Sequence, residues 1–122
     1  MSDELQIGRR RVRVTHPERV LFPADKVTKG DLAEYYAAIG DAIVPHLRDR
    51  PFTLKRYPYG IRGQPYFAKQ APKGKPPWIP TRRFRTWPRE GESRLVDFTL
   101  VNEPAALVWM VQMNCIDMNA WY

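Results

Sequence analysis

Residues 28–47 read Thr28-Lys-Gly-Asp-Leu-Ala-Glu-Tyr-Tyr-Ala-Ala-Ile-Gly-Asp-Ala-Ile-Val-Pro-His-Leu47, and this stretch predicts the clearest helix of the chain. Thr28 is a good N-cap, and Asp31 three residues later approximates a capping box, although Glu or Gln is the usual partner. The helix should end near Arg50-Pro51, where its apolar stripe stops. Its apolar residues recur at intervals of three and four, as on one helical face: Leu32, Tyr35, Tyr36, Ile39, Ile43, Val44 and Leu47.

The segments on either side of this helix predict strands and one more helix. Asn102 or Glu103 caps that second helix, with Pro104 in its first turn. Its residues 105–113 are apolar nearly all round, so we expect the helix to be buried against a sheet. Alternating or apolar patterns predict strands at 9–15, 52–57, 82–87 and 94–101 and the start of another at 117–122. The sequence thus predicts a single α+β domain over residues 1–122, with a mixed, partly antiparallel sheet and two main helices.

Composition excludes several classes of protein. The chain is 43% apolar and 12% aromatic, which is too rich in core-forming residues for a disordered chain. No apolar run is long enough to span a membrane, and the N-terminus lacks the pattern of a signal peptide. Cys115 is the only cysteine, so neither a disulfide framework nor a thiolate metal site is expected. These features predict a cytoplasmic protein with no membrane partner.

The net charge of +7 is concentrated in one part of the chain. Residues 48–94 contain thirteen Lys and Arg residues and only three acids, whereas residues 1–47 are balanced and residues 95–122 are acidic. Such a block attracts polyanions, chiefly because binding releases counterions from phosphates. A basic face that is simply solvated explains the charge alone equally well.

Aromatic residues are interleaved with the cations of this block, and this combination favours nucleic acid. Cations can hold phosphates, while exposed rings offer stacking faces for unpaired bases. Tyr66-Phe67 is the best candidate for exposure because it lies in a Pro- and Gly-rich stretch, whereas Phe84 and Trp87 could equally face the core. The sequence contains no phosphate loop, no nucleophile elbow, and no paired carboxylates or metal-ligand spacing. We therefore predict no catalytic or metal-binding residue in these 122 residues.

Ordered motifs along the chain resemble one known family. The motifs are His16-Pro-Glu-Arg-Val-Leu-Phe-Pro23, Val27-Thr-Lys-Gly-Asp-Leu32, Arg50-Pro-Phe-Thr-Leu-Lys-Arg-Tyr-Pro58, Tyr66-Phe-Ala-Lys-Gln-Ala-Pro-Lys73 and Cys115-Ile-Asp-Met-Asn-Ala-Trp-Tyr122. In this order and spacing they resemble the polymerase domain of bacterial DNA ligase D and its stand-alone homologues, a primase-type polymerase of the archaeo-eukaryotic primase superfamily. The resemblance implies that the chain is the N-terminal portion of such a domain, ending before the catalytic Asp-x-Asp motif.

The resemblance implies a pocket for the 5′-phosphate of a DNA end, formed by His16, Arg19 and Lys29. Arg and Lys suit this role because they give charge-assisted hydrogen bonds to phosphate oxygens. Lys29 follows the Thr28 cap, so the phosphate would also lie near a helix N-terminus. The alternative for Arg19 is a surface ion pair with Glu18 or Asp25.

Further positions match other parts of the family's DNA-binding surface. Tyr66 and Phe67 match an aromatic pair that stacks near the templating base, and Lys55 and Arg56 match cations that line the template path. Trp87, Arg89 and Arg94 match a loop that, in the family, helps to bring two DNA ends together. Asn119 matches a position near the incoming nucleotide that is often His. Asn carries no charge, so its role in nucleotide binding is weakened.

The predicted function is a DNA-end-binding module of a non-homologous end-joining repair polymerase, inactive as this chain alone. The expected partners are gapped or recessed duplexes with a 5′-phosphate, a DNA ligase and other end-joining proteins, at the bacterial nucleoid. No cofactor is expected in this chain, but Mn²⁺ or Mg²⁺ and a nucleoside triphosphate are expected for the complete domain. The alternatives are a fragment of a complete metal-dependent nucleotidyltransferase and a generic single-strand-binding protein. A domain that ends at Tyr122 should also leave the 105–113 helix partly uncovered and the last strand unpaired.

Overall fold

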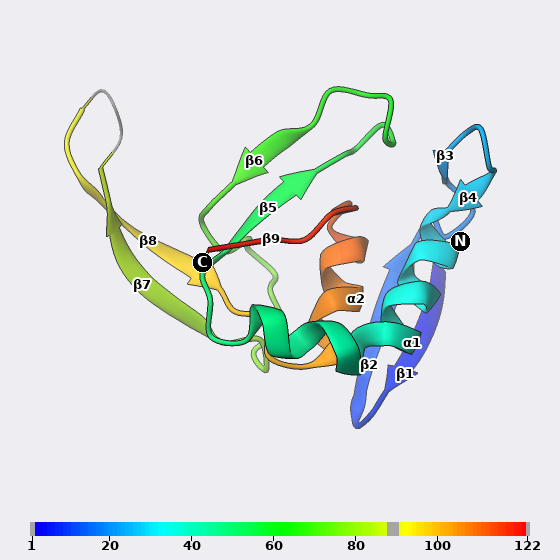
Figure 1. The fold of residues 1–122 in the computed structure, drawn as a ribbon, viewed down its shortest axis with the longest axis horizontal. Coiled ribbons are helices and arrows are strands. Elements are labelled where there is room, and N and C mark those ends of the chain that lie inside the picture. Colours follow the sequence, from blue (N-terminus) through cyan, green and yellow to red (C-terminus); the bar gives the residue numbers. More distant parts are fainter. Residues whose placement is uncertain (1, 88–90, 122) are drawn as a thin grey trace.

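The computed structural model describes residues 2–87 and 91–121, and within them it has two helices and nine strands (Figure 1). Every strand pair in this part of the chain is antiparallel. The predicted α+β class is therefore confirmed. In chain order the elements are β1 (Ser2–Ile7), β2 (Arg10–Thr15), β3 (Val20–Phe22), β4 (Val27–Thr28), α1 (Lys29–Leu47), β5 (Phe52–Arg56), β6 (Tyr66–Ala68), β7 (Thr81–Thr86), β8 (Arg94–Thr99), α2 (Pro104–Gln112) and β9 (Asn119–Ala120).

The first strand predicted from the sequence is β2, which pairs with β1 in a hairpin. Val12 and Val14 alternate with exposed arginines and are 3% and 1% exposed, so one face of β2 joins the core. The strand β1 was not predicted, because its sequence SDELQI lacks a clear alternation. Its conformation depends on pairing with β2 along its whole length.

The helix α1 begins as predicted, with Thr28 as its N-cap. The Asp31 backbone N–H donates to the Thr28 hydroxyl (3.1 Å), and the Thr28 backbone N–H donates to the Asp31 carboxylate (2.9 Å), which completes the capping box. Gly40 lies where α1 crosses the start of α2. A Cβ atom on Gly40 would stand 2.5 Å from the Cβ of Pro104, so only glycine permits this close approach.

The main sheet has the strand order β6-β5-β8-β7, and β9 pairs with β5 (Figure 1). The long β7–β8 ribbon is in register from Thr81 opposite Thr99 to Thr86 opposite Arg94. In Figure 1 this ribbon projects on the opposite side of the molecule from the β1–β2 hairpin. The sheet therefore carries the central basic segment on strands that are open to solvent.

The helix α2 is the centre of the core. Its residues 105–111 are all buried, and they pack with α1, β2 and β5 residues in one hydrophobic cluster. The expected exposure of this helix is therefore wrong: α1 and the β1–β2 hairpin already cover it. The last strand is not unpaired either, because Asn119 and Ala120 pair with Thr53 and Phe52 of β5. Among the described helices, none is long and apolar enough to cross a bilayer.

Candidate nucleic-acid interface

The segment from His16 to Arg19 is attached to the start of α1 by backbone hydrogen bonds. The Lys29 N–H donates to the Arg19 carbonyl (2.8 Å), and the Gly30 N–H donates to the Pro17 carbonyl (2.8 Å). A Cβ atom on Gly30 would lie 3.0 Å from the Cβ of Pro17, so glycine allows the two segments to meet. This attachment places Lys29 beside Arg19, two of the three residues predicted to bind a phosphate. The third, His16, precedes them in the same segment, and its exposed ring lies near Glu18.

Lys29 is a buried cation with no ion-pair partner among the described residues. Its side chain is only 2% exposed, and in the described part of the chain it has no hydrogen-bond acceptor or ion-pair partner. Burial lowers the pKa of Lys29 from 10.5 to about 8, and the nearby charges of Arg19 and Arg56 lower it further in the same direction. The charge of Glu18 raises this pKa, but more weakly than burial, Arg19 and Arg56 lower it. An unpaired buried ammonium is costly, so this position would gain from a bound anion.

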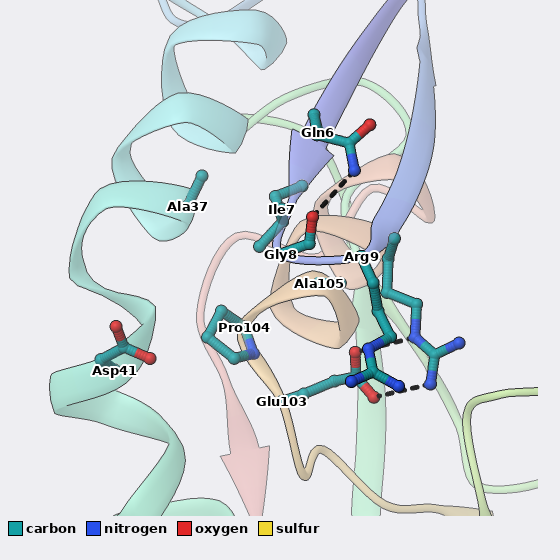
Figure 2. A pocket seen from close by; sticks show the side chains of 10 residues that line it. Gln6, Ile7, Gly8, Arg9, Ala37, Asp41, Glu103, Pro104 and Ala105 are labelled. Atoms are coloured by element: carbon teal, nitrogen blue, oxygen red, sulfur yellow. Dashed lines mark hydrogen bonds and ion pairs between the residues drawn. The ribbon is translucent and has the colours of Figure 1, made fainter.

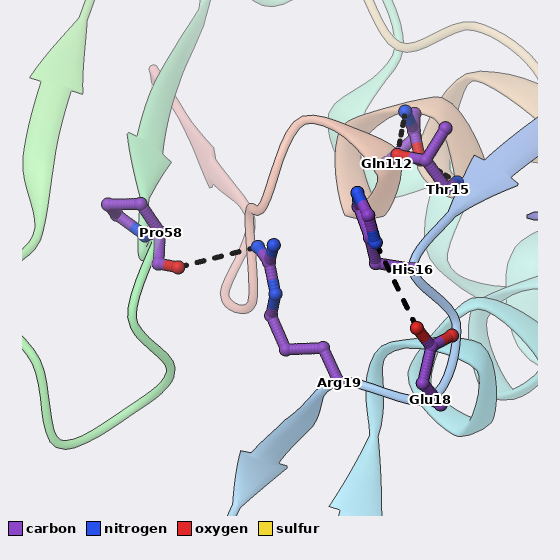
Figure 3. Close-up of polar contacts among 6 residues, drawn as sticks. All are labelled: Thr15, His16, Glu18, Arg19, Pro58 and Gln112. Carbon is purple, nitrogen blue, oxygen red and sulfur yellow. Dashed lines mark hydrogen bonds and ion pairs between the residues drawn. The ribbon is translucent and has the colours of Figure 1, made fainter. Parts of the chain in front are cut away.

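Arg19 reaches across to the segment after β5. Its Nη1 atom lies 3.4 Å from the carbonyl oxygen of Pro58 (Figure 3). It forms no ion pair with Glu18 or Asp25 among the residues described, so the surface-pair alternative does not hold in this structure. Glu18 instead lies 3.9 Å from Nδ1 of the exposed His16. The guanidinium of Arg19 thus keeps donors free beside Lys29.

The backbone at the start of α1 offers little to a phosphate. The N–H groups of Lys29 and Gly30 are bound to the His16–Arg19 segment, and the N–H of Asp31 is bound to Thr28. Helix N-termini bind anions mainly through such free N–H groups. Any phosphate at this place would therefore be held by side-chain cations rather than by the helix backbone.

The β5–β6 ribbon pairs each predicted cation with a predicted aromatic residue. Arg56 lies opposite Tyr66 and Lys55 lies opposite Phe67 in the register. The guanidinium of Arg56 is 5.4 Å from the Tyr66 ring centroid, and the ammonium of Lys55 is 5.7 Å from that of Phe67. Neighbouring residues of a strand point to opposite faces, so the ribbon has one such pair on each face.

Both rings of this ribbon are open to solvent. Tyr66 is 46% exposed and Phe67 is 63% exposed, as the sequence predicted. The Nε atom of Arg56 donates to the Met113 carbonyl at 2.8 Å, and the charge of Arg56 contributes, after burial and Arg19, to the lowered pKa of Lys29. The sequence placed Arg56 on a separate template path. Its closeness to Lys29 follows from tertiary structure and has no signal in the sequence.

Lys55 and Asn119 meet around Asp117. The Lys55 ammonium lies 3.9 Å from the Asp117 carboxylate, and the hydroxyl of Tyr57, followed by that carboxylate, raises the pKa of Lys55. The Asn119 amide donates to the Asp117 carbonyl at 3.3 Å. Asn119 therefore lies beside β5, next to an acid that the sequence did not assign to the site.

The β7–β8 ribbon holds the remaining predicted residues. Trp87 is 77% exposed and Arg94 is exposed on β8, while Arg89 lies outside the described residues. Phe84 faces inward and contacts the ring of Phe98, with 6.0 Å between centroids. Phe84 is therefore half-buried against Phe98 and Trp121 at the sheet, outside the main core cluster, whereas Trp87 lies on the surface.

Two arginines of β7 differ in their freedom to bind an anion. Arg83 forms a two-point ion pair with Asp97 of β8, at 2.8 and 3.2 Å. The hydrogen bond from Arg83 lowers the pKa of Asp97. Arg85 donates to the hydroxyl of Ser93 at 2.9 Å and keeps its net charge.

A hollow in the described structure lies away from these residues. It has a volume of about 650 Å³ and lies between the β1–β2 turn, α1 and the start of α2 (Figure 2). An ion pair of Arg10 with Glu103, 3.0 Å long, borders it. None of the predicted site residues lines it. Residues 2–87 and 91–121 also contain no group of three His, Cys, Asp or Glu side chains that could hold a metal ion.

This fold and surface match a known class of enzyme domain. The chain superposes on the solved polymerase domain from Mycobacterium tuberculosis ligase D in complex with DNA, with a TM-score of 0.77 and 30% identity. The superposition covers 90% of this chain and 37% of that one. The class is thus that of the primase-type polymerase domains.

Sequence relatives narrow the class to a family. The family model of the LigD primase-polymerase domain matches residues 28–122. The multifunctional non-homologous end-joining proteins LigD of Mycolicibacterium smegmatis and Pseudomonas aeruginosa are 31% and 36% identical to 89% and 90% of the chain. The chain belongs to the LigD primase-polymerase domain family. It spans only 14% and 12% of the length of these two relatives.

Proposed function

We propose that this chain binds broken DNA ends in end-joining repair and holds the 5′-phosphate of a recessed or gapped duplex between Arg19, Lys29 and His16. The observation that supports this most is the buried, unpaired ammonium of Lys29 next to a second and a third cation. A phosphate dianion would compensate this charge and accept hydrogen bonds from Arg19 and Lys29. The similarity to a polymerase domain in complex with DNA supports the same partner.

The β5–β6 ribbon supports a role for the unpaired strand beside the end. Tyr66 and Phe67 would stack on bases, while Arg56 and Lys55 hold phosphates near the rings. Trp87 and Arg94, at the β7–β8 ribbon, would contact a second DNA end together with Arg89. Asn119 would contribute a neutral hydrogen bond near the nucleotide. These roles follow from family membership together with the exposure of the described rings.

The end-joining relatives also support wider proposals. A DNA ligase and other end-joining proteins would act with this chain at the bacterial nucleoid, because the relatives are multifunctional end-joining proteins. Mn²⁺ or Mg²⁺ and a nucleoside triphosphate would serve the complete domain. The carboxylates of the described residues do not fit a metal ion, because no three of the possible ligands come together. No step of the DNA-end proposal therefore involves a metal.

A binding titration tests the proposal with two gapped duplexes that differ only in the 5′-phosphate. Each charge-assisted contact is worth about 1.5–3 kcal/mol when well ordered. Solvent competes at the rim, so we expect a preference of about tenfold, or roughly 1.4 kcal/mol, for the phosphorylated end. Lys29→Ala should remove most of this preference.

The matched control combines Arg82→Ala with Arg85→Ala, two exposed cations of β7. This variant should weaken both duplexes alike and reduce the salt dependence of binding, because only general phosphate contacts are lost. Equal affinity of the unaltered chain for the two ends would refute end recognition. The chain would then be a nucleic-acid-binding protein that does not recognise the 5′-phosphate.

A further inference from the structure

The strand β2 has one free edge. It pairs with β1 in a two-stranded sheet, and no other described strand joins it. In an antiparallel pair the backbone groups of alternate residues point toward the partner strand, and those between point away. Thr15 points away, because its N–H donates to the side-chain oxygen of Gln112 at 2.7 Å (Figure 3). By the same alternation, the N–H and carbonyl groups of Arg11 and Arg13 point away from β1.

A groove lies along this edge. It has a volume of about 310 Å³, within the range of ligand sites, and Arg11 and Arg13 border it. Its apolar lining includes Val12, Trp78, Trp109 and Met113. The guanidinium of Arg10 stacks 4.9 Å from the Trp78 ring centroid and so helps to hold this indole in place. Unpaired backbone groups thus lie beside an apolar surface.

The side chains of Arg11 and Arg13 give the groove a positive rim. They lie on the strand face opposite to Val12, because successive residues alternate in direction. Each donates to a neutral oxygen, that of Gln6 at 3.1 Å and that of Ser2 at 3.2 Å. Neither forms an ion pair with an acid in the part of the chain that is described. In the β1–β2 register Glu4 lies opposite Arg13 and offsets part of its charge, whereas Arg11 lies opposite the neutral Gln6. The guanidinium of Arg11 is therefore the less compensated of the two.

We propose that this groove binds an extended segment of a partner protein, which adds a strand to β2 and alternates acidic with apolar residues. Strand addition supplies both donors and acceptors to the free edge. Residues opposite Arg11 and Arg13 would share their face, where acidic side chains compensate the charges. The residue between them would lie over Val12 and the tryptophans. This site is independent of the DNA-end pocket.

The chemistry of the edge favours a peptide over nucleic acid. The free edge offers carbonyl oxygens as well as N–H groups, and phosphate has only acceptors to offer a carbonyl. A peptide backbone satisfies both kinds of group. Gln112 already occupies the N–H of Thr15, so the added strand would be short and centred on residues 11–13. We therefore expect weak binding whose specificity depends on charge.

Amide and indole chemical shifts can follow binding of the acetylated, amidated peptide Glu-Val-Glu-Val-Glu to the 122-residue chain. Shifts should concentrate at Arg11, Arg13, Trp78 and Trp109. The peptide Lys-Val-Lys-Val-Lys should bind at least tenfold more weakly. A Glu-Val-Glu-Val-Glu peptide with methylated backbone nitrogens should lose binding, since it cannot donate to the free carbonyls.

Two substitutions at one position separate backbone from charge. Arg13→Pro removes an N–H that points away from β1, so it should abolish binding of the peptide. The hairpin should persist, because the hydrogen bonds between β1 and β2 remain. Arg13→Ala keeps the N–H and should weaken binding only several-fold. Equal binding of the acidic and basic peptides, or of the methylated and unmethylated ones, would overturn the proposal. The proposal would also be overturned if a short DNA duplex changed the amide chemical shifts of Arg11 and Arg13 and the acidic peptide did not.

Discussion

Lys29→Met should stabilise the free chain while it removes the preference for a phosphorylated end. The pKa of Lys29 is lowered from 10.5 to about 8, mainly by burial. One pKa unit corresponds to 1.36 kcal/mol, so the buried charge costs roughly 3 kcal/mol near neutral pH. Methionine is unbranched, flexible and uncharged, and it can fill the same space. We expect the free energy of unfolding to rise by about 1–3 kcal/mol.

The stabilisation produced by Lys29→Met should decrease as the pH rises. Below pH 8 the ammonium is charged in both the folded and the unfolded chain, so the full cost is present. Between pH 8 and 10.5 the folded chain releases the proton while the unfolded chain keeps it, so stability rises with pH. The difference between Lys29→Met and the unaltered chain should therefore shrink across this interval and vanish above it.

Urea unfolding at pH 7 and at pH 10 measures this difference. With a typical slope of about 1–3 kcal/mol/M, the midpoint should move upward by roughly 1 M at pH 7 and by much less at pH 10. Lys26→Met is the matched control, because Lys26 is exposed in the β3–β4 turn and should change little. A Lys29→Met chain that is less stable at pH 7, or equally stabilised at both pH values, would refute the reasoning.

Three further changes test the packing and the ribbon. Gly40→Ala should lower the free energy of unfolding by about 1–3 kcal/mol, despite the better helix propensity of alanine, because its Cβ would meet Pro104 at 2.5 Å; thermal unfolding measures this. Thr28→Ala should cost about 1 kcal/mol in the same assay through loss of the capping box, and no loss would contradict that role. Replacing Tyr66 and Phe67 together by Ala should weaken binding to a duplex with a single-stranded overhang by about 1–3 kcal/mol per stacked base, but should leave blunt duplex binding unchanged in a fluorescence titration.

Local signals in the sequence predicted the elements that depend on local chemistry. Thr28 and Asp31 form the predicted capping box, because both partners lie within four residues. At α2 the prediction left Asn102 and Glu103 open as caps. Glu103 takes the position without a side-chain cap bond, whereas Asn102 exchanges hydrogen bonds with Asp49. The contact with Asp49 is distant in sequence and could not be read from the pattern.

For the candidate site, the exposure of single residues was predictable from the sequence, but their arrangement was not. The exposure of Tyr66 and Phe67 follows from their Pro- and Gly-rich surroundings, and the structure confirms it. The burial of Lys29 and its closeness to Arg56 depend on how the His16–Arg19 segment and β5 lie against α1. Such contacts join positions tens of residues apart. Periodicity reports only which face of an element is apolar, so it does not reveal them.

Hydrogen exchange at the backbone amides of Lys29 and Gly30, which are bonded to the His16–Arg19 segment, reports on the opening of the site. These two amide hydrogens can exchange with solvent only when the segment detaches from the helix start. Their exchange rates therefore measure the free energy that holds the His16–Arg19 segment against the start of α1, without any ligand or substitution. A ligand that needs the assembled cations must slow both amides together, and by the same factor, whereas one that binds on the β7–β8 ribbon leaves them as they are.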